Sequence, residues 1–208
     1  MKKITPYKTE RNALAALDNG GRFYNLITKA DDGKISTAEL SKAAGVFSGK
    51  QQMVLFLEMS LSALSPDSRK QILSSVSEDI KEAIYKYPTQ HLLPSEAKEN
   101  GVLSHNAIVT GVPKRIDSTD KFTGFIMIPM ITGKVTTFVM IPIIEQYDIY
   151  ELRDEASSKE FLIAHSKSSN KLPETRVKCA GILKELKSED KEDSKASIFL
   201  ETIYYSVI

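Results

Sequence analysis

The chain has 208 residues but no tryptophan, one cysteine and three histidines, and its Lys and Arg residues outnumber its Asp and Glu residues by one. The single Cys179 cannot form an internal disulfide, so nothing in the sequence requires an oxidising compartment. Proteins that hold nucleic acid mainly through phosphates carry a clear excess of Lys and Arg. The near-neutral charge therefore disfavours general nucleic-acid binding, although it leaves room for a local basic patch.

Long apolar segments are missing as well. Met1-Lys2-Lys3 is followed by polar and charged residues, not by the apolar region of a secretory signal. The most apolar segment, 122–144, is interrupted by two prolines, two glycines and Lys134. A membrane-spanning helix needs about 20 nearly uninterrupted apolar residues, so we expect no membrane span and a cytoplasmic location.

Sequence motifs for catalysis are absent too. The histidines are far apart, and none has a Cys or His neighbour at the spacing of metal ligands. Residues 45–51 approach a phosphate-binding P-loop, but the spacing is one residue short and Gln51 replaces the hydroxyl that would reach magnesium. We therefore name no catalytic residue and no cofactor.

What the chain does contain is a repeated apolar pattern, Thr-x-Phe-[Ile/Val]-Met-Ile-Pro-x-Ile, at 123–131 and again at 136–144. Thr132-Gly133-Lys134 separates the two copies, so we predict a β-hairpin over 123–144. The hairpin is either part of the core or an apolar β surface that binds a protein partner or a second copy of the chain. Prolines are tolerated at sheet edges, and large apolar patches mark interfaces.

The patterning changes from helical to strand-like near residue 100. Helices are expected at 10–17, 23–30 and 53–64. A further helix starts at the capping box Ser36–Glu39, and another runs from Ser65-Pro66-Asp67 to Pro88. A linker is expected at 87–101. Strands are expected at 105–115, 122–131, 135–144, 147–152, 159–165, 174–186 and 196–206. The predicted fold class is α+β, with an N-terminal helical bundle at 1–100 followed by a C-terminal antiparallel β-barrel or sandwich at 101–208.

Residues 31–40 resemble the second half of an EF-hand calcium loop, because Asp32 and Glu39 match two of its ligand positions. Thr28 and Ala30 stand where two further acidic or amide ligands are required, so we expect a capped turn without a metal ion. The turn is also similar to one found in TerB-like helical bundles. The degenerate site would comprise Asp31, Asp32 and Glu39.

Residues 147–186 resemble the middle of bacterial OB-fold domains. The shared order is a strand ending in Leu-x-Asp, a second strand, a proline, and a Val-x-Cys-x-Gly-x-Leu strand. The resemblance implies a barrel in which Gly181 lies at a sharp bend, with ligand contacts on one sheet face. Aromatic and arginine side chains on such a face can stack on bases, although the same residues occur in any β core. The candidate ligand-binding residues are Tyr147, Tyr150, Arg153, Phe161 and Arg176.

The sequence defines no reaction. We expect a non-catalytic binding or interaction module. The alternatives are a single-stranded nucleic-acid-binding OB-like protein and an enzyme with an unrecognised site.

Overall fold

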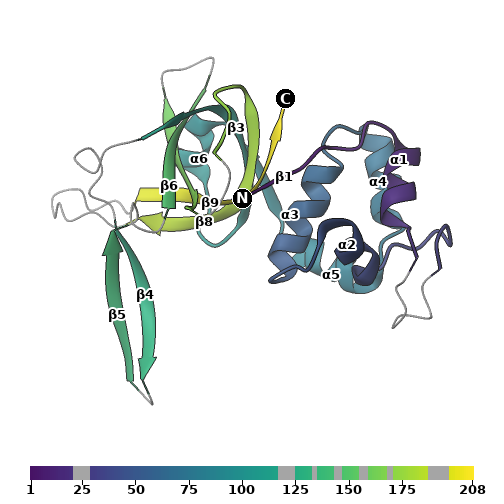
Figure 1. The fold of residues 1–208 in the computed structure, drawn as a ribbon, viewed down its shortest axis with the longest axis horizontal. Coiled ribbons are helices and arrows are strands. Elements are labelled where there is room, and N and C mark those ends of the chain that lie inside the picture. The colour runs from purple at the N-terminus through teal and green to yellow at the C-terminus, as the bar shows by residue number, and fades with distance from the viewer. Residues whose placement is uncertain are drawn as a thin grey trace. The chain divides into compact units, whose positions relative to one another are not determined.

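A computed structural model describes residues 1–20, 29–116, 125–132, 135–142, 147–154, 159–167, 171–186 and 197–208. The chain is an α+β protein in which helices dominate the N-terminal part and strands the C-terminal part (Figure 1). It divides into a helical unit, Lys3–Thr89, and a β unit formed by Met1–Lys2 and Gln90–Ile208. The expected helix at 23–30 and the charged segment 187–195 lie largely outside the described residues.

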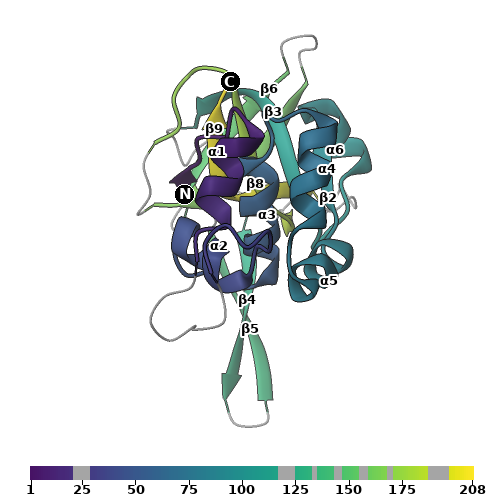
Figure 2. The same ribbon diagram turned by 90° about the vertical axis from the view of Figure 1, so that its right-hand side faces the viewer.

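The helical unit contains α1 Glu10–Leu17, α2 Thr37–Ala44, α3 Lys50–Ser60, α4 Pro66–Ser74 and α5 Glu78–Lys86, which can be followed in Figure 2. Packing joins α1 to α2 and α4, and α3 to α5. The helix expected at 53–64 corresponds to α3, in which residues 53–57 and Met59 are buried.

The predicted single helix from Ser65 to Pro88 was wrong, because α4 ends at Ser74 and α5 begins at Glu78. The intervening backbone bonds to Ile35 instead of continuing the helix. The Ile35 N–H donates to the Ser75 carbonyl at 2.9 Å, and the Ser77 N–H donates to the Ile35 carbonyl at 2.8 Å.

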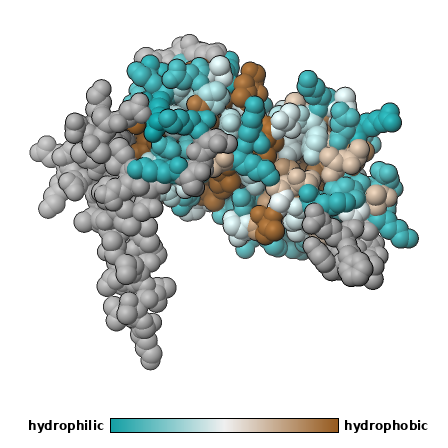
Figure 3. Space-filling model, viewed as in Figure 1, coloured by the Kyte–Doolittle hydropathy of each residue, from teal (hydrophilic) through white to brown (hydrophobic). Residues whose placement is uncertain are grey.

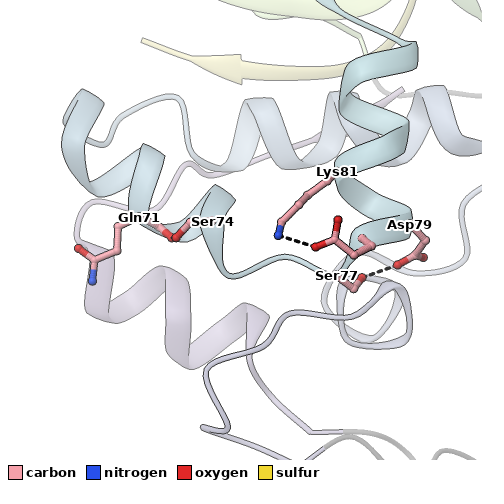
Figure 4. Close-up of polar contacts among 6 residues, drawn as sticks. Gln71, Ser74, Ser77, Asp79 and Lys81 are labelled. Atoms are coloured by element: carbon pink, nitrogen blue, oxygen red, sulfur yellow. Dashed lines mark hydrogen bonds and ion pairs between the residues drawn. The ribbon is translucent and has the colours of Figure 1, made fainter.

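Polar side chains support this break on both sides (Figure 4). Ser74 Oγ donates to the Gln71 carbonyl at 2.6 Å at the end of α4. At the start of α5, Ser77 Oγ donates to Asp79 Oδ1 at 2.5 Å. The acidic first turn of α5, Glu78 and Asp79, also complements the positive end of the helix dipole.

The expected linker at 87–101 is structured. It contains β2 (Thr89–Leu92) and α6 (Pro94–Asn100), and α6 packs on the β unit with Ala97 fully buried. The two units therefore divide between Thr89 and Gln90, about ten residues before the expected boundary at residue 100. No helix in the described part of the chain is long and apolar enough to cross a membrane.

The β unit is built on a seven-stranded sheet. Its strand β3 pairs with β6 and β8, β6 pairs with β7, and β9 pairs with both β7 and β8. The hydrogen-bonded neighbours therefore form the cycle β3–β6–β7–β9–β8–β3. Only β7–β9 is parallel among these pairs, so the expected antiparallel sheet is in fact mixed. The strands are β1 Lys2–Lys3, β3 Asn106–Arg115, β6 Tyr147–Arg153, β7 Glu160–Ser166, β8 Val177–Leu186 and β9 Ser197–Val207.

The predicted hairpin is confirmed as a two-stranded sheet of its own (Figure 1). Its strands are β4 (Phe125–Thr132) and β5 (Val135–Pro142), paired without a register shift from Phe125↔Pro142 to Thr132↔Val135. In the sheet of the β unit, the β8–β9 register shifts between Ala180 and Gly181.

Buried residues of the large sheet fall into two clusters. Alternate residues of a strand point to opposite faces, and the two clusters follow this alternation. The main core includes Ala97, Ala107, Val109, Tyr150, Leu152, Phe161, Ile163, Val177, Cys179, Leu183 and Leu200. The second cluster contains Ile149, Ala164, Leu186 and Phe199, with Ile116, Tyr147 and Leu162 packed against them.

Candidate ligand-binding face

The face of β6 and β7 that lies opposite the main core gathers both apolar and charged side chains. The register pairs Ile149 with Ala164, Glu151 with Leu162, and Arg153 with Glu160. We call this surface the β6–β7 face. It comprises Tyr147, Ile149, Glu151, Arg153, Glu160, Leu162 and Ala164.

One end of the β6–β7 face is apolar and aromatic. Ile149 and Ala164 are buried there beside Phe199 of β9. The Tyr147 ring meets the Phe199 ring edge-on, with centroids 6.5 Å apart and an interplanar angle of 74°. This geometry is favourable for an aromatic pair.

A hydrogen-bonded group links this end to β8 and β9. Tyr147 Oη donates to Glu201 Oε1 at 2.5 Å, and Lys184 Nζ lies 2.6 Å from Glu201 Oε2. Burial, together with the Glu201 carboxylate, raises the pKa of Tyr147 well above its ordinary value. The phenol therefore stays protonated and remains a donor, and both oxygens of Glu201 are engaged.

The other end of the β6–β7 face opens into a groove of about 960 Å³. Arg153 Nε lies 2.6 Å from Glu160 Oε1, and its Nη2 lies 3.7 Å from Glu151 Oε2. Lys159 Nζ lies 2.6 Å from Glu99 Oε1, and this hydrogen bond and charge lower the pKa of Glu99. The groove is lined by Lys98, Glu99, Glu151, Lys159, Glu160, Phe161 and Leu162.

The candidate residues from the sequence separate into three places. Tyr147 and Arg153 lie on the β6–β7 face, whereas Tyr150 and Phe161, each 2% exposed, pack into the main core. Arg176 is exposed just before β8, where its carbonyl accepts the Ile208 N–H at 3.1 Å. Strand alternation explains the split between Tyr147 and Tyr150, which are an odd number of residues apart.

Sequence reasoning missed Leu162, Phe199 and Glu201. Leu162 and Glu201 could have been found only from the register between strands. That register brings Leu162 opposite Glu151, and Glu201 beside Ala164. Periodicity within a single strand carries no information about such neighbours.

A polar cluster lies on the core side of the same strands. Asp148 and His165 are register partners, and Arg115 Nη2 donates to Asp148 Oδ1 at 2.9 Å. His165 is 1% exposed, stacks on Tyr150 at 5.5 Å, and has its Nδ1 2.9 Å from the Ser166 carbonyl. Within the described residues its Nε2 has no hydrogen-bond partner. Burial lowers the pKa of His165, against the opposing effects of the Ser166 carbonyl and Asp148.

We expect the β unit to lose stability as the pH falls below about 6.5, the ordinary pKa of histidine. The unfolded chain takes up a proton there that folded His165 resists, so protonation favours unfolding. A His165→Phe variant keeps the ring stacked on Tyr150 and should flatten this dependence. Urea denaturation between about pH 7.5 and pH 5 measures it. An unchanged slope in His165→Phe would show that another group causes the dependence.

The acidic residues of the EF-hand-like turn have separate roles. Glu39 is fully buried, and its Oε1 accepts the Gly20 N–H at 2.8 Å. Its Oε2 accepts both the N–H and the Oγ of Ser36 at 2.8 Å, which confirms the expected capping box. Asp31 and Asp32 are exposed. Among the described residues, no group of His, Cys, Asp or Glu is arranged to hold a metal ion.

Nearby, Asp18 closes the same turn. Its carboxylate accepts the Gly33 N–H at 2.7 Å and the Asp32 N–H at 3.3 Å. Backbone donors thus engage the buried carboxylates of the turn, where a calcium site would direct them at an ion.

The outer surface offers no broad apolar patch in the view of Figure 3, where hydrophilic residues cover most of the described surface. Comparison with known proteins adds no family to this geometry. No family model matches the chain, and no curated protein matches it.

Proposed function

We propose that the chain is a non-catalytic binding module, with an OB-like barrel as its β unit and a protein segment as its ligand. The observation that carries this proposal is the pairing cycle β3–β6–β7–β9–β8–β3 with its single parallel pair, β7–β9. In an OB-fold the first strand pairs with the second and fourth, and the third pairs with the fifth in parallel. The observed order supports the same closure, which also removes free strand edges.

The position of the groove fits this interpretation. OB-folds bind ligands across their second and third strands and the adjoining loops. In this chain the corresponding strands are β6 and β7, which contribute Glu151, Glu160, Phe161 and Leu162 to the lining of the groove. The β6–β7 face is therefore the surface on which we expect the ligand.

The charges favour a protein ligand over a nucleic acid. Arg153, Lys159 and Lys184 each already pair with a glutamate of the chain. A phosphate backbone would have to displace these carboxylates, and its affinity depends on cations that it can neutralise. A polypeptide can bring charges of both signs around an apolar centre, which is the composition of protein interfaces. Side chains that form ion pairs are also better suited to binding a charged partner than to transferring a proton.

The test uses two matched charge reversals in the full-length chain. Arg153→Glu changes the β6–β7 face, and Arg176→Glu makes the same change at an exposed position before β8. A partner captured by the wild-type chain from its own cell extract is identified, purified and titrated against all three proteins by calorimetry. We expect Arg153→Glu to weaken binding about tenfold or more and Arg176→Glu to leave it within about twofold.

Equal affinities for the two variants would place binding elsewhere and contradict the proposal. The alternative, single-stranded nucleic-acid binding, is tested with labelled oligothymidine and oligouridine in about 20 mM salt. Saturable binding that weakens with salt and is lost in Arg153→Glu would favour that alternative. We expect no saturable binding.

A further inference from the structure

The β4–β5 hairpin presents two unpaired edges. It forms its own sheet, and no other described strand hydrogen-bonds to the outer side of β4 or β5. An isolated two-stranded ribbon is at best marginally stable in water. Its outer N–H and C=O groups are also a template for pairing with another strand.

The register determines which amides face outward. Thr132 and Val135 close the hairpin across a two-residue connection, and such a closing pair is hydrogen-bonded. Bonded and non-bonded pairs then alternate along the ladder. The backbone groups at the non-bonded pairs therefore point to the outer edges. On β5 these positions are Thr136, Phe138, Met140 and Pro142, and on β4 they are Phe125, Met127, Pro129 and Ile131.

Both prolines of the hairpin fall in the outward-facing set. Neither therefore removes a hydrogen bond from the β4–β5 ladder, and each removes a donor from an outer edge. Pro129 interrupts the β4 edge in the middle, whereas Pro142 stands at the end of β5. The β5 edge alone keeps three successive outward amides, at Thr136, Phe138 and Met140.

We propose that β5 pairs with β5 of a second copy of this chain, antiparallel about a two-fold axis. Phe138 then lies opposite Phe138 of the second copy, and Thr136 lies opposite Met140. The three outward amides are symmetric about Phe138, so each finds a carbonyl and none is left unpaired. The result is one four-stranded sheet in the order β4–β5–β5–β4. A sheet of three or more strands can be stable in water, whereas an isolated two-stranded hairpin is marginal.

The chemistry of the hairpin fits a second copy as the occupant. Neither Phe125–Thr132 nor Val135–Pro142 contains a charged residue, so symmetric pairing brings no like charges together. Pro129 also limits the assembly. Head-to-tail pairing of β5 with β4 would extend into an open filament, and the missing amide in the middle of β4 opposes it. The proposal therefore specifies a closed dimer.

Light scattering after size exclusion tests the proposal on the full-length chain at micromolar concentration. We expect a mass of twice 23.2 kDa for the wild type. Phe138→Pro removes the central β5 amide, and Met127→Pro removes an outward amide of β4; neither amide serves the hairpin ladder. We expect Phe138→Pro to raise the dimer dissociation constant about tenfold or more, and Met127→Pro to leave it unchanged.

A second pair of variants avoids dependence on proline. Thr136→Lys/Met140→Lys places like charges opposite each other in the proposed register, and Thr136→Lys/Met140→Glu places opposite charges there. We expect the first to be monomeric and the second dimeric, with circular dichroism confirming that both fold. A monomeric wild type would overturn the proposal. So would equal masses within either pair of variants.

Discussion

Replacing Gly181 with alanine is expected to lower the free energy of unfolding of the β unit by about 3 kcal/mol. Gly181 lies at the shift in the β8–β9 register, fully inside the sheet. A Cβ atom there would overlap the carbonyl oxygen of Glu201, which belongs to the paired strand. Because the obstacle is backbone, relief requires that β8 and β9 move apart.

Urea denaturation followed by circular dichroism measures this loss. Gly49→Ala is the matched control, since a Cβ at Gly49 would meet no atom within 4 Å. Gly49 precedes α3 as its N-cap, where alanine is only modestly unfavourable, so we expect a change of less than about 1 kcal/mol. Similar losses in the two variants would show that the bulge tolerates a side chain.

Replacing Glu39 with alanine is expected to destabilise the helical unit by about 3 kcal/mol. The carboxylate is fully buried and accepts hydrogen bonds from the Gly20 N–H, the Ser36 N–H and the Ser36 hydroxyl. Its removal leaves buried donors without an acceptor. Each such donor costs about 1–3 kcal/mol, and hydrogen bonds to water that enters the site reduce this cost.

The control is Glu96→Ala, because Glu96 occupies the same third position of α6. Among the residues that the structure describes, its Oε2 accepts the Leu93 N–H alone, at 2.7 Å, on an exposed surface. We expect that variant to lose about 0.5–1 kcal/mol. Calorimetry of both variants measures the difference. Equal losses would mean that burial adds nothing to the role of Glu39 beyond capping.

Much of the local structure could be predicted from the sequence. Seven expected strands are found close to their predicted bounds, because alternating or apolar segments separated by turn residues are a local signal. The helix Glu10–Leu17 and the capping box Ser36–Glu39 were also predictable from local sequence. A helix cap depends on residues that are three positions apart.

What could not be predicted depends on contacts between distant segments. The break between α4 and α5 follows from backbone bonds to Ile35, about forty residues earlier, which no pattern in 65–88 reveals. The parallel β7–β9 pair and the position of α6 on the β unit are equally non-local. The same limit applies to the candidate site, for which the sequence suggested Tyr147 and Arg153 of the β6–β7 face but neither Leu162 nor Glu201.

The cycle of strands also has one weakly paired junction, between β7 and β9, which we call the seam. Among the described residues, two pairs join β7 to β9, Ile163↔Leu200 and Ala164↔Glu201, against ten between β8 and β9. Local opening of a fold starts where the fewest bonds must break. The Tyr147–Glu201 hydrogen bond connects β6 to β9 across this seam, over the intervening β7. A ligand on the β6–β7 face that covers Tyr147 would cover the seam as well. Binding would then suppress opening and slow the exchange of nearby amide hydrogens with solvent.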